Sequence, residues 1–289
     1  MKLASYLHQG RKSYGIAAED GMIDLGRHLG DSFPDLKALL AGNALAQAQE
    51  LSHLPADLAF NTLTFLPVIE HPEKILCVGM NYAEKRKEFD QHNPAPTLFV
   101  RFADSQTGHA SPIIKPSHSV EFDYEGELAV IIGRAGENIA RDQALSHVAG
   151  YSCYMDGSAR DWQHTWFTAG KNWRQTGAFG PWMTTSDEIP DPNTLAIRTW
   201  LNGRKVQDDN TRSMIHNVAE LIEYISTFTA LGAGDVIITG SPGGVGKKRV
   251  PPLFMQPGDR IEVEIEKIGH LSNVIVAAGS QVGHAAAVH

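Results

Sequence analysis

The segment DYEGELAVIIG, residues 123–133 of a 289-residue chain, gives the sharpest local signal in the sequence. Its second half is a short apolar run of the length of a buried strand. A strand here places Glu125 and Glu127 on one face, two positions apart. Two carboxylates so close repel each other unless a cation lies between them, and Mg²⁺ is a hard cation that takes carboxylate oxygens. The same pattern also fits a solvated strand face, so both interpretations stay open at this point.

The segments around this stretch predict an α+β, β-rich chain. Alternating or β-branched runs predict strands at 3–10, 14–25, 75–78, 120–133, 195–207, 235–240 and 259–276. Helical spacing predicts helices within 35–54 and 217–231, and a shorter one at 140–150. Strands do not alternate with long helices, which argues against a doubly wound parallel sheet. We expect a small N-terminal α/β domain over residues 1–70 and a second domain over 71–289.

Composition excludes several classes of protein. The formal net charge is −8, which argues against a nucleic-acid-binding surface. No apolar run is long enough to cross a bilayer, and the basic N-terminus does not resemble a signal peptide. The two cysteines, Cys77 and Cys153, rule out a disulfide framework and favour a reducing compartment. We therefore expect a cytoplasmic protein with two inert core thiols.

Two further segments carry polar residues of interest. Asp156 follows the apolar run 148–155 and precedes a polar, helix-like turn. It is a candidate third metal ligand at a strand end, or equally a helix N-cap. The loop 240–248, GSPGGVGKK, resembles a phosphate cradle, but Ser241 stands where glycine is required and Lys247 is followed by Lys248. The spacing therefore fails for a P-loop.

Taken in order along the chain, these motifs resemble the fumarylacetoacetate hydrolase family from about residue 75 to 276. The matching motifs are E-x-E at Glu125 and Glu127, D-x-x-A-R-D-x-Q from Asp156, GKNW around Lys171, GPW at 180–182, LNGRKVQ with T-x-x-M at 211–214, and GDVIITGSPGGVG. The resemblance implies a mixed β-roll with a small N-terminal domain, and a homodimer. It also implies that Glu125, Glu127 and Asp156 bind Mg²⁺, with Mn²⁺ or Ca²⁺ as alternatives.

The resemblance also implies substrate contacts. Lys171 would stabilise an oxyanion or enolate, and Arg160 would hold a substrate carboxylate as a bidentate fork. Gln163, Ser241 and Tyr82 are further predicted contacts by their motif positions. A solvated surface position for Lys171, and a structural ion pair of Arg160 near Asp161, are the alternatives.

The segment NYAEKRKEF, residues 81–89, departs from the family. Hydrolytic relatives carry a histidine and, three residues later, a glutamate on a mobile lid. Here Glu88 matches, but Lys85 replaces the histidine. A lysine is protonated at neutral pH unless it is desolvated, so Lys85 is either a perturbed base or the partner of Glu88 in an i,i+3 ion pair. Glu88 alone, or His92 further along the segment, would then activate water, or no water is activated.

A second departure is Arg174, where many relatives have an acidic residue nearby. The added positive charge favours a more anionic substrate, or one with a distal carboxylate.

The predicted function is that of a Mg²⁺-dependent hydrolase that cleaves a carbon–carbon bond in an acylpyruvate-like or fumarylacetoacetate-like diketo acid, in aromatic compound catabolism. The alternative within enzymes is a decarboxylase or isomerase of a related 2-oxo acid, such as an oxaloacetate decarboxylase or a 2-hydroxyhepta-2,4-diene-1,7-dioate isomerase, because Lys85 replaces the lid histidine. A degenerate protein that binds a metal and a dicarboxylate without turnover is the alternative outside enzymes. In each case the expected partner is a small acidic molecule, with no nucleic acid or membrane involved.

Overall fold

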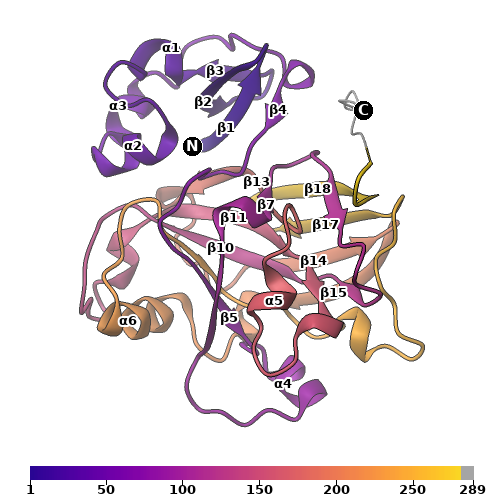
Figure 1. Ribbon diagram of the computed structural model, residues 1–289. Coiled ribbons are helices and arrows are strands. Elements are labelled where there is room, and N and C mark those ends of the chain that lie inside the picture. Colours follow the sequence, from indigo (N-terminus) through magenta and orange to yellow (C-terminus); the bar gives the residue numbers. More distant parts are fainter. Residues whose placement is uncertain (281–289) are drawn as a thin grey trace.

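The computed structural model describes residues 1–280 (Figure 1). The strand predicted within residues 123–133 lies in the middle of its main sheet. This strand, β10 (Gly126–Ile132), is buried at every position. Leu128 and Val130 face one hydrophobic core, whereas Ala129 and Ile131 face the other. The strand therefore has apolar layers on both sides, which explains its continuous apolar run.

β10 belongs to a mixed sheet of eleven strands that is mostly antiparallel. In order along the sheet these are β3 (Met22–Asp24), β2 (Arg11–Ala17), β1 (Lys2–His8), β13 (Gly177–Thr185), β11 (Val148–Asp156), β10, β16 (Val236–Ile238), β5 (Ile75–Gly79) and β6 (Thr97–Arg101), with β4 (Thr64–Phe65) beside β1 and β7 (Gln106–Thr107) beside β13.

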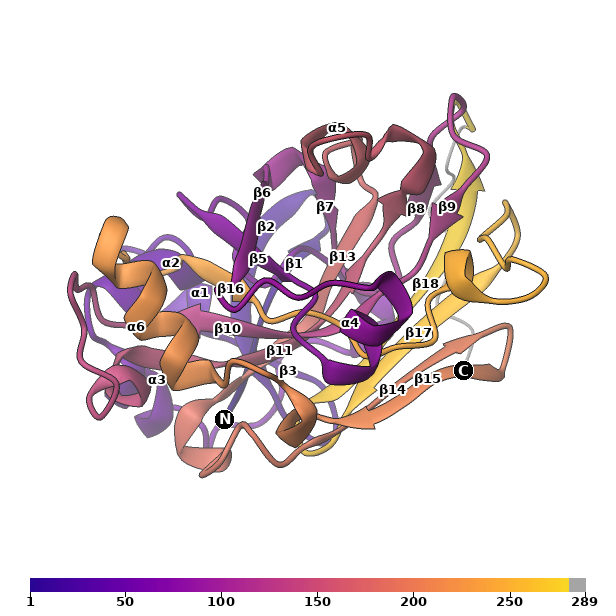
Figure 2. The same cartoon turned by 90° about the horizontal axis from the view of Figure 1, so that it is seen from below.

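A second sheet packs on one face of the first, where β17 and β18 contact β11 and β14 contacts β10 (Figure 2). Its order is β15 (Arg204–Asn210), β14 (Ala196–Leu201), β17 (Arg260–Ile265), β18 (Gly269–Ala277) and β8 (Ile113–Lys115). A short ladder of β9 (Phe122–Asp123) and β12 (Ser158–Ala159) stands apart. The apolar core between the two sheets includes Leu128, Val130, Ile197 and Val263.

Six α-helices surround the sheets in the described residues. They are α1 (Leu25–Leu29), α2 (Leu36–Ala41), α3 (Leu45–Glu50), α4 (Ala83–Phe89), α5 (Thr168–Lys171) and α6 (Val218–Phe228). The longest, α6, starts with a capping box in which Asn217 and Glu220 exchange hydrogen bonds, and it buries Leu221, Ile222 and Ile225. Short 3₁₀ turns join other elements, among them η4 (Arg160–Trp162) and η7 (Gly246–Lys248).

The N-terminal segment lies at one end of the molecule in Figure 1 and carries β1 to β3 with α1 to α3. Its strands are not an isolated sheet, because Lys2 and Leu3 of β1 pair with Thr184 and Met183 of β13. The proposed domain boundary at residue 70 falls shortly before β5, so it separates chain segments that share a sheet. Residues 281–289 of the proposed second domain lie outside the described residues.

The β-rich α+β class is confirmed, as are the predicted strands. The short helix predicted at 140–150 is wrong. Residues Ala144–His147 form only a 3₁₀ turn, and β11 begins at Val148. The β-branched Val148 and the aromatic residues after it pair with β10 and β13, and this sheet pairing takes the place of a helix.

Candidate metal and substrate site

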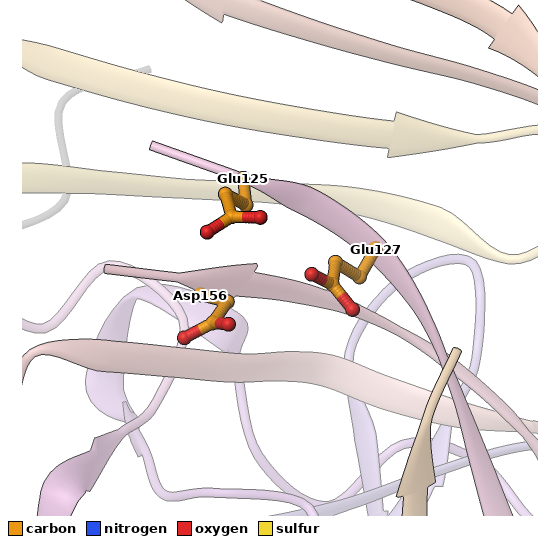
Figure 3. A group of neighbouring side chains, drawn as sticks. All are labelled: Glu125, Glu127 and Asp156. Carbon is orange, nitrogen blue, oxygen red and sulfur yellow. The ribbon is translucent and has the colours of Figure 1, made fainter. Parts of the chain in front are cut away.

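The register of β10 and β11 brings three carboxylates together. Gly126 pairs with Met155 and Glu127 with Tyr154, and the Asp156 N–H donates to the Glu125 carbonyl at 2.8 Å. Asp156 therefore lies directly across from Glu125 and diagonal to Glu127. One carboxylate oxygen of each residue lies within 4.8 Å of the others, and Figure 3 shows the three groups around a common point. We call Glu125, Glu127 and Asp156 the carboxylate triad.

The donor set of the triad fits a divalent cation. The three residues are 3%, 2% and 0% exposed, respectively, so the solvated strand face is not the arrangement here. Buried carboxylates repel each other and require positive charge nearby. Their oxygens are the ligands that Mg²⁺ and Mn²⁺ accept, with water completing the shell. Glu125, Glu127 and Asp156 are the residues that could hold such an ion.

The pKa directions within the triad differ, and each has a physical cause. Burial, followed by the charges of Asp156 and Glu125, raises the pKa of Glu127 well above its ordinary value. Burial acts in the same direction on Glu125, but the cations Arg160, Lys171 and Lys85 outweigh it and hold the pKa of Glu125 well below the ordinary value. Glu127 is therefore the member of the triad whose negative charge the surrounding cations compensate least, and a cation beside it would stabilise that charge.

Lys171 lies inside this cluster rather than on the surface. It ends α5 and is 2% exposed. Its ammonium donates to Glu125 Oε1 at 2.8 Å, to Asp156 Oδ2 at 2.5 Å and to Ser158 Oγ at 2.6 Å. The Lys171 ammonium thus contacts two members of the triad, Glu125 and Asp156.

Arg101 is a further buried cation of this cluster, and none of the sequence motifs predicts it. It ends β6, is 2% exposed, and forms an ion pair with Asp156. It also donates to the Gly157 carbonyl at 3.1 Å and to Thr176 Oγ1 at 2.8 Å. An arginine inside the apolar run LFVRFA is the one signal of a buried cation, because arginine is rarely buried unless it is paired.

The glycine-rich loop after β16 holds carboxylates instead of phosphate. The Gly240 N–H donates to Glu127 Oε2 at 2.6 Å, the Gly244 N–H to Glu88 Oε1 at 2.9 Å, and the Gly246 N–H to Asp123 Oδ1 at 2.7 Å. Gly240 has φ +97°, and a Cβ there would lie 2.8 Å from the Val78 carbonyl oxygen. Glycine is therefore required for this loop to approach the triad.

Helix α4 carries the two residues of the sequence departure. Lys85 is 2% exposed, forms an ion pair with Glu125 Oε2, and lies 2.5 Å from Ser241 Oγ. Glu88 bonds the Gly244 N–H instead of Lys85, and its other oxygen, Oε2, is buried without a hydrogen-bond partner in the described residues. Lys85 and Glu88 therefore do not form the i,i+3 ion pair that the sequence suggested. Lys85 pairs with Glu125 instead, and Glu88 accepts from the Gly244 N–H.

Arg160 and Gln163 follow β12 and lie beside the triad. Arg160 Nε donates to Asp123 Oδ2 at 2.9 Å, and its Nη2 is 2.9 Å from Glu125 Oε1 without hydrogen-bond geometry. Within the described residues, Gln163 Nε2 is also buried without a partner. Asp161 instead accepts from Ser119 Oγ. Arg160 thus has ion pairs with Asp123 and Glu125, and its Nη2 and Gln163 Nε2 have no hydrogen-bond acceptor among the described residues.

The other predicted residues differ in their placement. Ser241 is fully buried and donates to Glu125 Oε2 at 3.1 Å. Tyr82 is buried in the core, and its hydroxyl has no partner among the described residues. His92 is 85% exposed and lies 3.0 Å from Asp90, whereas Arg174 is exposed. The structure therefore brings Ser241 to the triad but leaves His92 and Arg174 at the surface.

Two surface hollows in the described part of the chain do not reach the triad. One, of about 370 Å³, is lined by Arg204 and residues 249–253. The other, of about 690 Å³, is lined by residues of the N-terminal segment, β13 and the β17–β18 hairpin. Side chains of α4 and α5, together with Ser241 and the Gly240 N–H of the 240–248 loop, contact the carboxylate cluster instead.

Residues 74–276 match the Fumarylacetoacetate (FAA) hydrolase C-terminal family, and the chain belongs to this family. The oxaloacetate tautomerase fahd2, mitochondrial, of Xenopus laevis is 42% identical over 226 residues, which is 76% of this chain and 70% of that protein.

Solved structures are similar over nearly the whole chain. A putative HpcE protein from Mycobacterium smegmatis has a TM-score of 0.85 and 31% identity, with 96% of this chain and 100% of that chain covered. Maleylpyruvate hydrolase from Sphingobium sp. SYK-6, in complex with manganese(II) and pyruvate, has a TM-score of 0.81 and 26% identity, with 96% and 99% covered.

The resemblance seen in the sequence is therefore confirmed. Membership of this family supports an enzyme that acts on oxo acids. Among the residues that the structure describes, no helix is both long and apolar enough to span a membrane.

Proposed function

We propose that this protein is a metal-dependent tautomerase that interconverts the keto and enol forms of a small 2-oxo dicarboxylic acid of the oxaloacetate type. The observation that carries this proposal is the burial of Lys85 between Glu125 and Ser241. An ammonium paired with a carboxylate does not accept a proton from water. The name of the Xenopus relative, an oxaloacetate tautomerase, also supports the proposal of a tautomerase.

A divalent cation, for which we propose Mg²⁺ or Mn²⁺, would be held by Glu125, Glu127 and Asp156. When bound, it would act as a Lewis acid toward the carboxylate and 2-oxo oxygens of the substrate. Manganese in the similar maleylpyruvate hydrolase supports this choice of ion. We also propose that two copies of this chain form a homodimer, as the resemblance to the family implies.

Lys171 would bind the developing enolate oxygen. Its ammonium is buried beside the triad, so its charge is poorly screened where the oxygen becomes negative. Arg160 Nη2 and Gln163 Nε2, which have no hydrogen-bond acceptor among the described residues, would hold the substrate carboxylate next to the 2-oxo group. Replacing Lys171 with methionine should lower kcat by about 10²–10³-fold, the usual cost of losing one such donor.

Glu88 would move the proton at C3. Its Oε1 is fixed by the Gly244 N–H, and its Oε2 lacks a partner among the described residues. In the ketone-to-enol direction, Glu88 takes a proton from C3, the C–H electrons form the C2–C3 double bond, and the 2-oxo oxygen receives a proton that comes from water. The reverse direction returns the proton from Glu88 to C3.

Hydrolysis of a carbon–carbon bond is the second candidate. The similarity to a maleylpyruvate hydrolase favours it. In that case Glu88 Oε2 would accept a proton from water instead of from C3. Glu88 would then have to activate water alone, because the ammonium of Lys85 is paired with Glu125 and is not available as a base, and the products distinguish the two reactions.

The experiment follows enol absorbance of oxaloacetate with Mg²⁺ or with EDTA, while pyruvate, CO₂ and total oxaloacetate are measured. We expect Mg²⁺-dependent loss of the enol with total oxaloacetate conserved, a large loss of rate in Glu88→Gln, and normal rates in the exposed control Glu137→Gln. Parallel assays with acylpyruvates test hydrolysis. Carbon–carbon cleavage of those acids without tautomerisation of oxaloacetate would replace this proposal by the second candidate.

A further inference from the structure

Lys85 has an unusual position for a lysine in a charged helix. Its neighbours Ala83, Glu84 and Lys87 on α4 are exposed, whereas Lys85 is 2% exposed. Its ammonium contacts one carboxylate, Glu125, and one hydroxyl, Ser241. A buried ammonium is costly unless it is paired with a negative group. The position of α4 over the site is thus tied to an acceptor for Lys85.

A divalent cation and Lys85 would compete for the same carboxylate. Glu125 Oε1 is already contacted by Lys171 at 2.8 Å and by Arg160 at 2.9 Å, and Glu125 Oε2 by Lys85. A cation on Glu125 would therefore lie close to the Lys85 ammonium and weaken that ion pair. Ser241 would remain as a neutral partner, which does not offset a buried charge.

The charges of the whole cluster indicate which group would replace Glu125 as the partner of the Lys85 ammonium. The fully buried groups of the cluster are four carboxylates, Asp123, Glu125, Glu127 and Asp156, and four cations, Lys85, Arg101, Arg160 and Lys171. The half-buried Glu88 adds a fifth carboxylate. A divalent cation would add two positive charges to this set. A substrate with two carboxylates offsets both of these charges, whereas a substrate with one offsets only one.

Building on the proposed function, we infer that Lys85 determines substrate specificity. Its ammonium changes partner, from the Glu125 carboxylate in the metal-free protein to a substrate carboxylate in the metal-loaded enzyme. In the metal-free protein it pairs with Glu125. In the metal-loaded enzyme its ammonium binds the second carboxylate of a dianionic substrate, while Arg160 and Gln163 hold the first. Lys85 thereby selects 2-oxo dicarboxylic acids over monocarboxylic ones.

The first test measures metal affinity without turnover. Titration calorimetry of the substrate-free protein should show that Lys85→Met binds Mg²⁺ about tenfold more tightly or better, because the competing cation is gone. Lys87→Met, an exposed position on the same helix, is the matched control and should leave the affinity unchanged. Equal or weaker Mg²⁺ binding by Lys85→Met would overturn the exchange. Lys85→Gln serves if the methionine variant does not fold.

The second test measures selectivity with ligands that do not react. Malate and its 4-methyl ester share a 2-hydroxy acid end but differ by one charge. In Mg²⁺, wild type should prefer malate, and Lys85→Met should reduce that preference by about tenfold or more. An unchanged preference refutes the inference. Because neither ligand tautomerises, this result stands apart from the proposed function, which fails instead if wild type does not turn over oxaloacetate.

Discussion

Arg101→Met should destabilise the metal-free protein strongly. The Arg101 side chain pairs with Asp156 and donates to the Gly157 carbonyl and Thr176 Oγ1, and both charged groups are fully buried. Methionine fills a similar volume but leaves Asp156 with Lys171 as its remaining cation. Breaking one partner of a buried ion pair costs about 3–5 kcal/mol, which for a chain of this size lowers Tm by roughly 10 °C.

Magnesium should repair part of this loss. With less positive charge near the triad, the variant should bind Mg²⁺ more tightly, and each tenfold gain in affinity adds about 1.4 kcal/mol of stability at saturating ion. Denaturant unfolding in EDTA and in Mg²⁺ measures both effects. Arg198→Met is the matched control, because the ion pairs of Arg198 with Asp208 and Glu264 are 40–46% exposed and should be worth about 1 kcal/mol or less. An Arg101→Met variant as stable as this control in EDTA, or an equal Mg²⁺ increment in both proteins, would refute the reasoning.

Three other predictions concern pH, thiol reactivity and the glycine loop. Burial lowers the pKa of His109 from 6.5 to about 4, so the unfolded chain binds more protons and stability is lost as pH falls from 6.5 toward 4. His109→Asn should remove up to about 3 kcal/mol of that loss, as urea unfolding at pH 7 and pH 4.5 would reveal. Cys77 and Cys153 are both fully buried with raised pKa values, so a thiol reagent should modify them only in denaturant, and rapid labelling of the native protein would contradict this. Gly240→Ala should cost about 1–3 kcal/mol more than Gly203→Ala, because both have positive φ but only the former would clash with the backbone; equal melting temperatures would count against this.

The sequence predicts the centre of the fold because β10 combines two local signals. Its apolar run requires burial on both faces, and the two-residue repeat places Glu125 and Glu127 on the same side. Asp156 can be predicted as a third candidate ligand because it directly follows the apolar run 148–155. The distance between these residues depends on the pairing of β10 with β11, which composition alone does not define.

The cations around the triad are harder to predict. The segment AEKRKEF has two lysines and one arginine, and nothing local distinguishes Lys85, which is buried, from Lys87, which is exposed. Arg101 and Asp123 acquire their partners through contacts with residues 37 to 123 positions away. The sequence of the glycine loop resembles a phosphate site. In the structure its N–H groups donate to the carboxylates of Glu127, Glu88 and Asp123, which come from other segments of the chain.

Calorimetric titration with Mn²⁺ measures whether the carboxylate triad binds a divalent cation. Wild type and Glu137→Gln, an exposed acidic control, should each bind about one ion per chain. Glu127→Gln should bind at least about tenfold more weakly, because it removes a charged ligand from the triad. Equal Mn²⁺ affinity in Glu127→Gln and wild type would place the ion outside the carboxylate triad.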